Sequence, residues 1–475
     1  MPEALFFWLF AIACVLLIAN ELYYLVFQNI SIDSIRKIAR DYVHHQYYRP
    51  WVPKPILIPA TKKMMTELSE TPVLSQRAVY ADMFGFKHTL NGLDGNEVNT
   101  RRSRLFSRVL QVQGPAQFQE LYPYLHRHMK IFVDAQLPSD TRSIRLALFS
   151  ETVLSRLMGV WFFGEKMASD PRLRDALLDF PRQIKACSAA FQLTPRLLAP
   201  LVHAIITSRG AAMHLIQDTL INAMAAGINS LDEKPEFKRL TLLYHLMDLS
   251  APDRSYWSPD VLSQSILGLW LAASHQPWVN LHAILIELSL RPDWQDALRH
   301  EALQNQDDLA NKINQLPLLD SFMRETARVN LLDRVAIRRK ALTDYTFSSG
   351  SPSVRAGSIL CVPLYGVARN GRIYPDPEQF DGKRFLNGRC KDTSRKFTDV
   401  SENHLIWGYG SLACPGRHHA SLILKMVIVH IVVNYSLQLA DPEMPRWWTW
   451  EDFRMPYAST RVVFSKRRTK AGVSS

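Results

Sequence analysis

The feature that most constrains this chain is a short loop around Cys414. An aromatic residue, Trp407, is followed by glycines one and three places on, and Cys414 stands directly before Pro-Gly and a long apolar run. Glycine permits positive φ and a close approach of the backbone to a flat ligand. A cysteine at a helix N-terminus lies beside unpaired N–H groups, which favour the thiolate. The pattern predicts a ligating sulfur in a tight loop; the alternative is an ordinary buried cysteine after a glycine turn.

A thiolate held in this way can be the single axial ligand of haem iron, where its electron donation favours O–O cleavage. The loop resembles the haem-binding signature of the cytochrome P-450 superfamily, the haem-thiolate monooxygenases, which reads aromatic-x-x-Gly-x-x-x-Cys-x-Gly. Trp407, Gly410, Cys414 and Gly416 fill that signature, with Cys414 as the ligand of iron in haem b. Leu412 stands where many members carry a cation for a haem propionate, so that charge must come from elsewhere.

A second motif of the family, Glu-x-x-Arg, is present as Glu325 and Arg328. Residues at i and i+3 share a helix face, and any surface helix can show this pair. The motif lies 89 residues before the cysteine (414 − 325), which is the family's order and approximate distance. The resemblance implies that Arg384 is the third member and that the trio has a structural role. A buried Glu between two Arg is tolerable only if all three are hydrogen-bonded.

The resemblance also implies cations for the two haem propionates. Arg338 follows Arg328 by ten residues, in the first strand expected after that helix. Arg102, next to Arg101, falls where a second contact is common in the family. For each of these arginines the alternative is a solvated side chain.

Family members carry a long helix over the haem, with an acid and a hydroxyl that relay protons to bound oxygen. In this chain His275 occupies the position of the acid and Gln276 that of the threonine, with Ser274 as a further hydroxyl candidate. Pro277 lacks an N–H, so we expect a local break that frees the carbonyl of Ala273. His275 can exchange protons near neutral pH. The alternative is an outward-pointing His275 on a helix that merely kinks.

Apolar residues recur at helical spacing over most of the chain between residues 62 and 331. From Arg334 to Pro363 short β-branched runs alternate with glycines and predict strands and turns, and Leu422–Val433 predicts a buried helix. With the resemblance, these patterns predict a mainly α protein with small β-sheets, the cytochrome P-450 fold, in a single large domain. The clearest helical stretches are Ser150–Phe163, Pro195–Met224, Pro235–Leu249 and Pro259–Leu290.

The N-terminus carries an uncharged run over residues 4–19, continued over 22–27. A membrane span needs about 20 apolar residues, and this run reaches that length by tolerating Glu21 near one end. Basic residues follow at 36, 37 and 40, which keeps the bulk of the chain cytosolic. We expect a single-pass anchor at 1–28 in the endoplasmic reticulum membrane, a proline-containing linker at 29–60 and the catalytic domain at 61–475. A signal peptide and a buried helix are the alternatives.

The chain carries 56 Lys and Arg against 44 Asp and Glu, a formal net charge of +12. That excess suits an anionic membrane surface or an acidic partner. Since no nucleic-acid-binding signature accompanies it, we expect no nucleic acid partner. The five cysteines show no close pairing, which argues against a disulfide framework and suits a reducing compartment.

These observations favour a monooxygenase that takes electrons from NADPH through a cytochrome P-450 reductase and oxidises a hydrophobic small molecule. The overall sequence is similar to fungal secondary-metabolite members, which implies a terpenoid or meroterpenoid substrate. Without the threonine, a haem-thiolate enzyme that rearranges, dehydrates or couples without oxygen insertion stays open. A non-catalytic membrane haem protein is the third hypothesis.

Overall fold

The computed structural model describes residues 55–90, 92, 101–137, 141–194, 196–227, 235–386 and 389–467. The chain divides into two units, Met1–Val52 and Pro53–Ser475, and every described residue belongs to the second. The expected membrane anchor at 1–28 therefore lies outside the described residues. The expected linker at 29–60 overlaps the folded unit, because its residues Ile56 and Leu57 form a strand.

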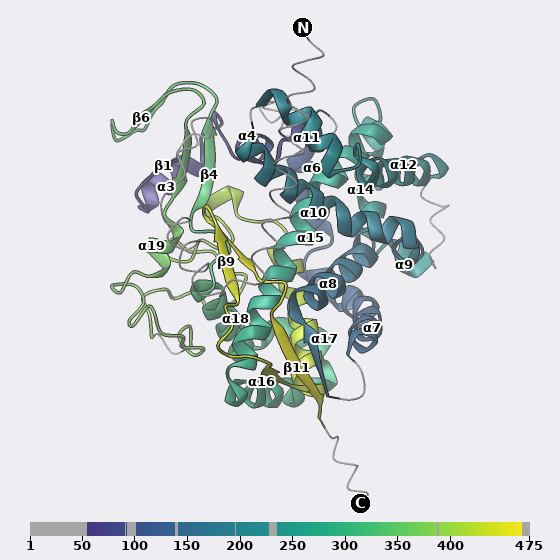
Figure 1. The fold of residues 1–475 in the computed structure, drawn as a ribbon, viewed down its shortest axis with the longest axis vertical. Helices are drawn as coiled ribbons and strands as arrows, with labels where there is room; N and C mark the ends of the chain where they lie inside the picture. Colours follow the sequence, from purple (N-terminus) through teal and green to yellow (C-terminus); the bar gives the residue numbers. More distant parts are fainter. Residues whose placement is uncertain are drawn as a thin grey trace, which may run out of the picture. The chain divides into compact units, whose positions relative to one another are not determined.

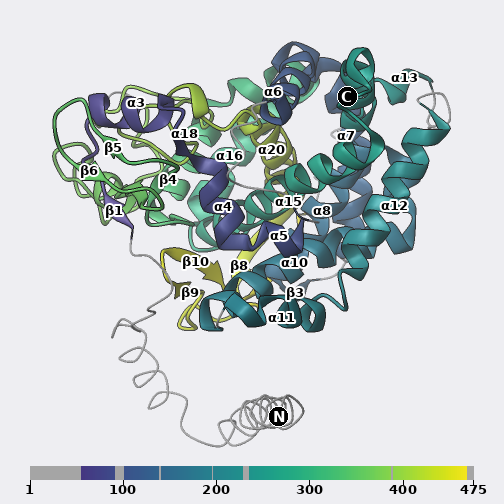
Figure 2. The same ribbon diagram turned by 90° about the horizontal axis from the view of Figure 1, so that it is seen from above.

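Helices fill most of the second unit up to Val329 (Figures 1 and 2). In chain order they are α3 (Lys62–Glu70), α4 (Gln76–Phe84), α5 (Phe86–Thr89), α6 (Arg101–Val112), α7 (Phe118–Gln136), α8 (Leu146–Phe163), α9 (Glu165–Ser169), α10 (Pro171–Leu193), α11 (Ala199–Ile206), α12 (Ala211–Ala226), α13 (Pro235–Lys238), α14 (Leu242–Ser250), α15 (Pro259–Ser289), α16 (Pro292–Gln304), α17 (Leu309–Lys312) and α18 (Pro317–Val329). Two more helices follow, α19 (Leu364–Ala368) and α20 (Arg417–Asn434).

The long helix α15 forms the centre of the core and packs against α8, α12, α18 and α20. Its start is fixed by Ser258, whose side chain accepts a hydrogen bond from the Val261 N–H, and by Pro259 in the first turn. The helix α8 is apolar and long enough to cross a membrane. Most of its residues are buried inside the protein, so it is a core helix. The buried α20 contains the predicted Leu422–Val433.

The predicted helical stretch Pro195–Met224 is divided into two helices, α11 and α12. The chain turns between them, where Ser208, Arg209 and Gly210 all have positive φ. The Thr207 hydroxyl donates to the His203 carbonyl and accepts from the Gly210 N–H at 2.8 Å, which stabilises the turn. Three left-handed residues in a row cannot continue a right-handed helix, although the apolar spacing does not reveal the interruption.

The strands form four small sheets. The largest has the order β1-β7-β4-β2, in which β1 and β7 are parallel and the other pairs are antiparallel. Its register shifts between Ala336 and Arg339, and Ile337 has φ +51°. The other sheets have the orders β3-β11-β8, β10-β9 and β5-β6. The strands are β1 (Ile56–Leu57), β2 (Leu74–Ser75), β3 (Arg142–Arg145), β4 (Ala336–Ala341), β5 (Tyr345–Thr346), β6 (Ser353–Val354), β7 (Ile359–Val362), β8 (Tyr435–Leu439), β9 (Trp447–Trp450), β10 (Phe453–Pro456) and β11 (Arg461–Lys466).

Candidate active site

The Cys414 loop is closed by its own backbone. The Cys414 N–H donates to the Trp407 carbonyl at 2.7 Å, across a turn in which Gly408 has φ +81° and Gly410 has φ +64°. Side chains other than glycine are strained at these angles. A Cβ on Gly410 would lie 3.6 Å from the Ser69 Cβ, because the loop packs against α3. The helix α20 begins three residues after the cysteine, as the sequence pattern predicts.

The Cys414 thiol is free and partly exposed. Burial raises its pKa above the ordinary value, and the N–H groups of Gly416 and Arg417 and the Arg417 charge offset this only in part. The N–H groups at the start of α20 thus favour the thiolate, as predicted, but burial opposes them more strongly. A metal ion bound at the sulfur would add a positive charge that favours the thiolate.

The segment that precedes the Cys414 loop in sequence contacts the loop through Phe397 and Thr398. The Trp407 indole N–H donates to the Phe397 carbonyl at 2.7 Å, and the two rings meet edge to face at 5.2 Å. Arg417 donates to the Cys414 carbonyl at 2.8 Å and to the Thr398 carbonyl at 3.2 Å. Trp407 is thus a fixed part of the loop.

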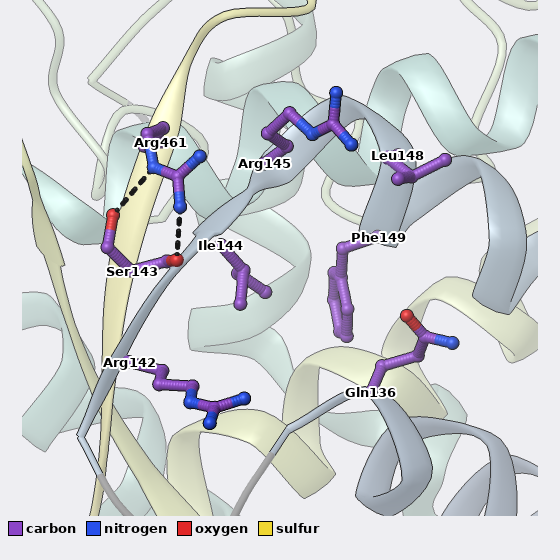
Figure 3. A pocket seen from close by; sticks show the side chains of 8 residues that line it. All are labelled: Gln136, Arg142, Ser143, Ile144, Arg145, Leu148, Phe149 and Arg461. Carbon is purple, nitrogen blue, oxygen red and sulfur yellow. Dashed lines mark hydrogen bonds between the residues drawn. The ribbon is translucent and has the colours of Figure 1, made fainter.

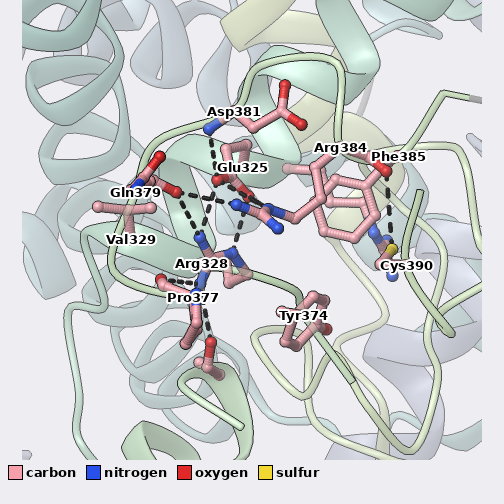
Figure 4. Close-up of polar contacts among 12 residues, drawn as sticks. Glu325, Arg328, Val329, Tyr374, Pro377, Gln379, Asp381, Arg384, Phe385 and Cys390 are labelled. Carbon is pink, nitrogen blue, oxygen red and sulfur yellow. Dashed lines mark hydrogen bonds and ion pairs between the residues drawn. The ribbon is translucent and has the colours of Figure 1, made fainter. Parts of the chain in front are cut away.

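Glu325, Arg328 and Arg384 come together in a buried cluster (Figure 4). Arg328 donates to both carboxylate oxygens of Glu325, at 2.7 and 2.8 Å, and Arg384 donates at 3.0 and 3.1 Å. The backbone N–H of Asp381 adds a contact at 2.9 Å. The two guanidinium groups use their remaining donors on backbone carbonyls, among them Pro377 at 2.7 Å from Arg328. The cluster is hydrogen-bonded throughout, which a buried charge group requires.

Two further buried ion pairs in this region were missed by the sequence reasoning. Arg324 pairs with Asp392 at 2.8 Å and also donates to the carbonyls of Lys396 and Asp399. Asp320 pairs with Lys425 at 2.8 Å, and its other oxygen accepts the Phe397 N–H. These pairs fix the segment that leads into the Cys414 loop. The signal for one of them was a lysine inside the apolar run of α20, since a charge there needs a partner.

The structure separates the roles of two adjacent arginines on β4. Arg338 pairs with the carboxylates of Asp333 and Asp452, the latter at 3.3 Å. Arg339 is 2% exposed, and it donates to the Arg338 carbonyl at 2.8 Å. Its Nε has no hydrogen-bond partner, and within the described residues it has no carboxylate partner. Burial lowers the pKa of Arg339 to about 10. The expected propionate contact at Arg338 stays a prediction, and Arg339 is the cation that lacks a counter-charge.

Arg102 lies in the first turn of α6. One of its terminal nitrogens donates to the Gln264 side chain of α15 at 2.8 Å. Its Nε is buried and has no hydrogen-bond partner. Like Arg339, this arginine offers an unused donor to an anionic group.

The three residues of α15 that were predicted to relay protons to bound oxygen, Ser274, His275 and Gln276, differ in exposure. Gln276 and Ala272, one turn apart on the same face, are exposed, whereas Ser274 is buried with no partner for its hydroxyl. The His275 Nε2 is also buried without a partner. Burial, and then the charge of Lys185, holds the pKa of His275 well below its usual range, so the ring is neutral. The helix runs from Pro259 to Ser289 with Pro277 inside it, so the expected local break does not end the helix. Because Pro277 has no N–H, the Ala273 carbonyl still lacks its helical donor.

Two surface cavities lie away from these residues. One, of about 460 Å³, is lined by Arg142, Arg145 and Arg461 among eight residues (Figure 3). The other, of about 570 Å³, lies beside β8 and β11. Neither is lined by Cys414 or by any other predicted site residue.

The residues fit a haem held by one sulfur. Within the described ranges, no group of three or more His, Cys, Asp or Glu could hold a metal ion by itself. Cys414 would hold the iron, and a porphyrin would supply its other ligands. The glycine turn permits a flat group to approach, and the unused donors of Arg102 and Arg339 suit carboxylates. Fold and site thus define a haem-thiolate protein.

The comparisons with known proteins agree. The cytochrome P450 family model matches residues 59–456, and the chain belongs to this family. It is 28% identical over 325 residues to the cytochrome P450 monooxygenase terQ of Tolypocladium album, which covers 66% of this chain and 58% of that protein. It is 26% identical over 410 residues to janQ of Penicillium janthinellum, another cytochrome P450 monooxygenase, covering 83% of this chain and 80% of that protein.

A solved structure shows the same fold. The retinoic acid bound cyanobacterial CYP120A1 aligns with a TM-score of 0.65 at 16% identity, covering 84% of this chain and 86% of that chain. The predicted fold, mainly α with small sheets, is confirmed.

Proposed function

We propose that this chain is a membrane-associated haem-thiolate monooxygenase of fungal secondary metabolism, acting on a hydrophobic terpenoid or meroterpenoid. The observation that carries the proposal is the Cys414 loop, which its own backbone hydrogen bond closes and which lies in a P450 fold. Bound haem would supply activation of O₂, with electrons from NADPH delivered by a reductase. Cys414 would hold the iron, and α15 would exclude water and move protons. The matched fungal monooxygenases support the substrate class.

The proposed substrate wall is formed by two segments joined through their backbones. The Arg334 N–H donates to the Asp452 carbonyl at 2.8 Å, and the Arg454 N–H donates to the Leu332 carbonyl at 3.0 Å. Leu331, Val335 and Ile337 on the first segment are apolar and buried. These apolar side chains suit a hydrophobic ligand, and Asp333 and Arg334 are polar exceptions on the same segment.

A basic surface next to the cysteine loop supports the proposed reductase. Lys391, Arg395 and Lys396 are exposed on the segment that leads into the loop. Their charges would attract an acidic partner to the side of the molecule where Cys414 lies.

An exposed apolar patch supports membrane association. Leu197, Leu201 and Ile205, spaced at four-residue intervals along η2 (Arg196–Leu198) and α11, are 92%, 55% and 69% exposed. Trp448 on the β9–β10 hairpin is 40% exposed, and Figure 2 shows this hairpin and α11 along the same edge. Large exposed apolar surfaces mark interaction sites, and a bilayer suits a chain whose N-terminal sequence is apolar. The endoplasmic reticulum, with the catalytic domain in the cytosol, is the proposed location.

The function is tested by expressing the full chain with an NADPH–cytochrome P450 reductase and supplying a panel of fungal terpenoids and meroterpenoids. We expect NADPH-dependent products heavier by one oxygen atom. Products of unchanged mass, or lighter by water, would favour the rearranging or dehydrating enzyme. Pigment without any turnover would favour a non-catalytic haem protein.

Membrane contact is tested with a fluorophore on Leu201→Cys and, as a control, on Leu148→Cys, which replaces a 44% exposed leucine of α8. Vesicles of phosphatidylcholine that carry brominated acyl chains quench a probe inserted in the bilayer. We expect strong quenching at position 201 and little at position 148. Equal quenching at both positions would contradict the proposed orientation.

A further inference from the structure

Three arginines line the surface cavity at the junction of β3, β11 and the start of α8 (Figure 3). Arg142 and Arg145 come from β3, and Arg461 comes from β11. All three side chains are exposed, and no Asp or Glu is among the residues that line the cavity. Within the described residues, neither Arg142 nor Arg145 pairs with a carboxylate. The cavity therefore gathers three positive charges that no lining residue neutralises.

The strand register places two of these charges directly opposite each other. In the antiparallel pair of β3 and β11, Arg145 is the partner of Arg461. Like charges at directly opposed positions destabilise an antiparallel pair. Arg461 donates to the Ser143 hydroxyl at 3.0 Å and to the Ser143 carbonyl at 2.6 Å, which fixes its guanidinium group and leaves its charge in place. An anion bound between the two arginines would replace this repulsion by attraction.

The helix α8 begins at the edge of the cavity and does not offset the arginines. Its first turn contains no acidic residue, and Arg145, directly before the helix, caps it with no side-chain hydrogen bond. The N–H groups at the start of a helix carry a partial positive charge. A carboxylate that would reduce the positive potential is thus missing at the one place in α8 where it would also stabilise the helix.

The rest of the cavity wall is mainly apolar. Ile144, Leu148 and Phe149 line it, and Figure 3 shows Arg142 and Arg145 on two sides of Ile144 and Phe149. Guanidinium groups bind phosphate through paired N–H donors. The cavity volume of about 460 Å³ lies within the range of about 300–1,000 Å³ that small-molecule sites occupy. These features together suit a phosphate group joined to a small apolar group.

We propose that this cavity is a second binding site, apart from the haem, for a phosphate monoester or diphosphate that carries a small apolar group. A lipid headgroup has the same phosphate chemistry. Figure 1, however, shows β11 toward the lower end of the second unit and α11, with its exposed leucines, at the upper end. The proposed membrane contact is therefore on the other side, and the cavity takes its ligand from solution.

The site is tested by calorimetric titration of the full-chain holoenzyme with phenyl phosphate and with inorganic phosphate. We expect wild type to bind both, phenyl phosphate more tightly because its ring covers the apolar wall. Arg145→Gln should weaken binding about tenfold or more, since hydrogen bonds to charged groups are strong. Arg172→Gln removes an exposed arginine of α10 outside the cavity and should bind as wild type does. No binding by wild type, or equal binding by Arg145→Gln, would overturn the proposal.

Thermal unfolding separates loss of the site from loss of the fold. Without phosphate, Arg145→Gln should unfold at the same temperature as wild type or higher, because the repulsion with Arg461 is removed. Added phenyl phosphate should raise the unfolding temperature of wild type, since it binds only the folded chain. Arg145→Gln and the independent variant Arg142→Gln should lose most of this rise. A rise of the same size in wild type and in both variants would overturn the proposal.

The source of the ligand is tested with a fluorophore on Leu148→Cys at the cavity wall. Vesicles of phosphatidylcholine with brominated phosphatidic acid quench a probe that a lipid headgroup draws to the bilayer. We expect little quenching with these vesicles, in agreement with a ligand from solution. Strong quenching would assign the arginines to a lipid headgroup and would overturn the dissolved ligand.

Discussion

The two sides of the candidate site treat buried polar groups in opposite ways. Behind the Cys414 loop, Glu325, Arg328 and Arg384 are hydrogen-bonded to one another and to backbone carbonyls. On α15, the Ser274 hydroxyl and the His275 Nε2 are buried without a partner. A satisfied network stabilises one geometry, whereas an unsatisfied buried group costs free energy unless a ligand or water completes it. The cluster behind the loop therefore holds Cys414 in one position. The unpartnered groups on α15 are free to hydrogen-bond to a bound ligand or water.

The largest effect is expected from removing the Cys414 sulfur, which the hydrogen-bonded cluster behind the loop holds in position. We expect Cys414→Ser to fold and to lose haem, since a serine oxygen does not replace a thiolate at iron. Haem per chain and the reduced, CO-bound absorption spectrum measure the effect. Cys390→Ser, whose hydroxyl can keep the contacts to backbone carbonyls, is the control. Purified Cys414→Ser with an unaltered spectrum would refute the site.

The buried cluster of Glu325, Arg328 and Arg384 is tested by Glu325→Ala. This change leaves two buried guanidinium groups without their carboxylate, which costs about 3–5 kcal/mol of unfolding free energy. Urea unfolding measures it. The exposed Glu402→Ala in the neighbouring segment should fall within about 0.5 kcal/mol of wild type. If the two variants unfold alike, the cluster does not stabilise the loop.

The two arginines of β4 sharpen the comparison, because Arg338 is paired with protein carboxylates and Arg339 is not. We expect Arg339→Met to speed haem loss to a haem-scavenging globin about tenfold, a difference of about 1.4 kcal/mol. Arg338→Met should affect mainly stability, since it leaves Asp333 and Asp452 unpaired. The opposite ranking would assign the propionate contact to Arg338.

The smallest expected effect concerns His282, two turns beyond His275 on α15. Burial lowers its pKa to about 3. The unfolded chain takes up a proton below its ordinary pKa of 6.5 and the folded chain does not, so stability is lost as the pH falls from about 6.5 toward 3. At pH 5.5 His282→Leu should remove about 1 kcal/mol of this loss. His300→Leu, which replaces an exposed histidine of α16, is the control, and equal acid sensitivity in both variants would count against the neutral, buried ring of His282.

The local chemistry of the site was readable along the chain. The glycines at 408 and 410 and the position of Cys414 just before an apolar run are visible in the sequence. They predicted the positive φ angles of the loop and the start of α20 after the cysteine. The Glu325–Arg328 pair follows from helical spacing, which places residues i and i+3 on one face. Apolar periodicity also located α15 and α20, because a helix with an apolar surface must be buried.

The tertiary structure decided which of the buried polar side chains have a hydrogen-bond or ion-pair partner. Arg338 and Arg339 are neighbours of the same type, yet only one meets carboxylates, because a register shift in β4 and the β9–β10 hairpin bring Asp333 and Asp452 to Arg338. Lys185 contacts Trp278, 93 residues further along the chain, only through the packing of α10 against α15. A polar side chain's partner depends on where other segments lie, and burial sets the free energy of leaving it unpaired.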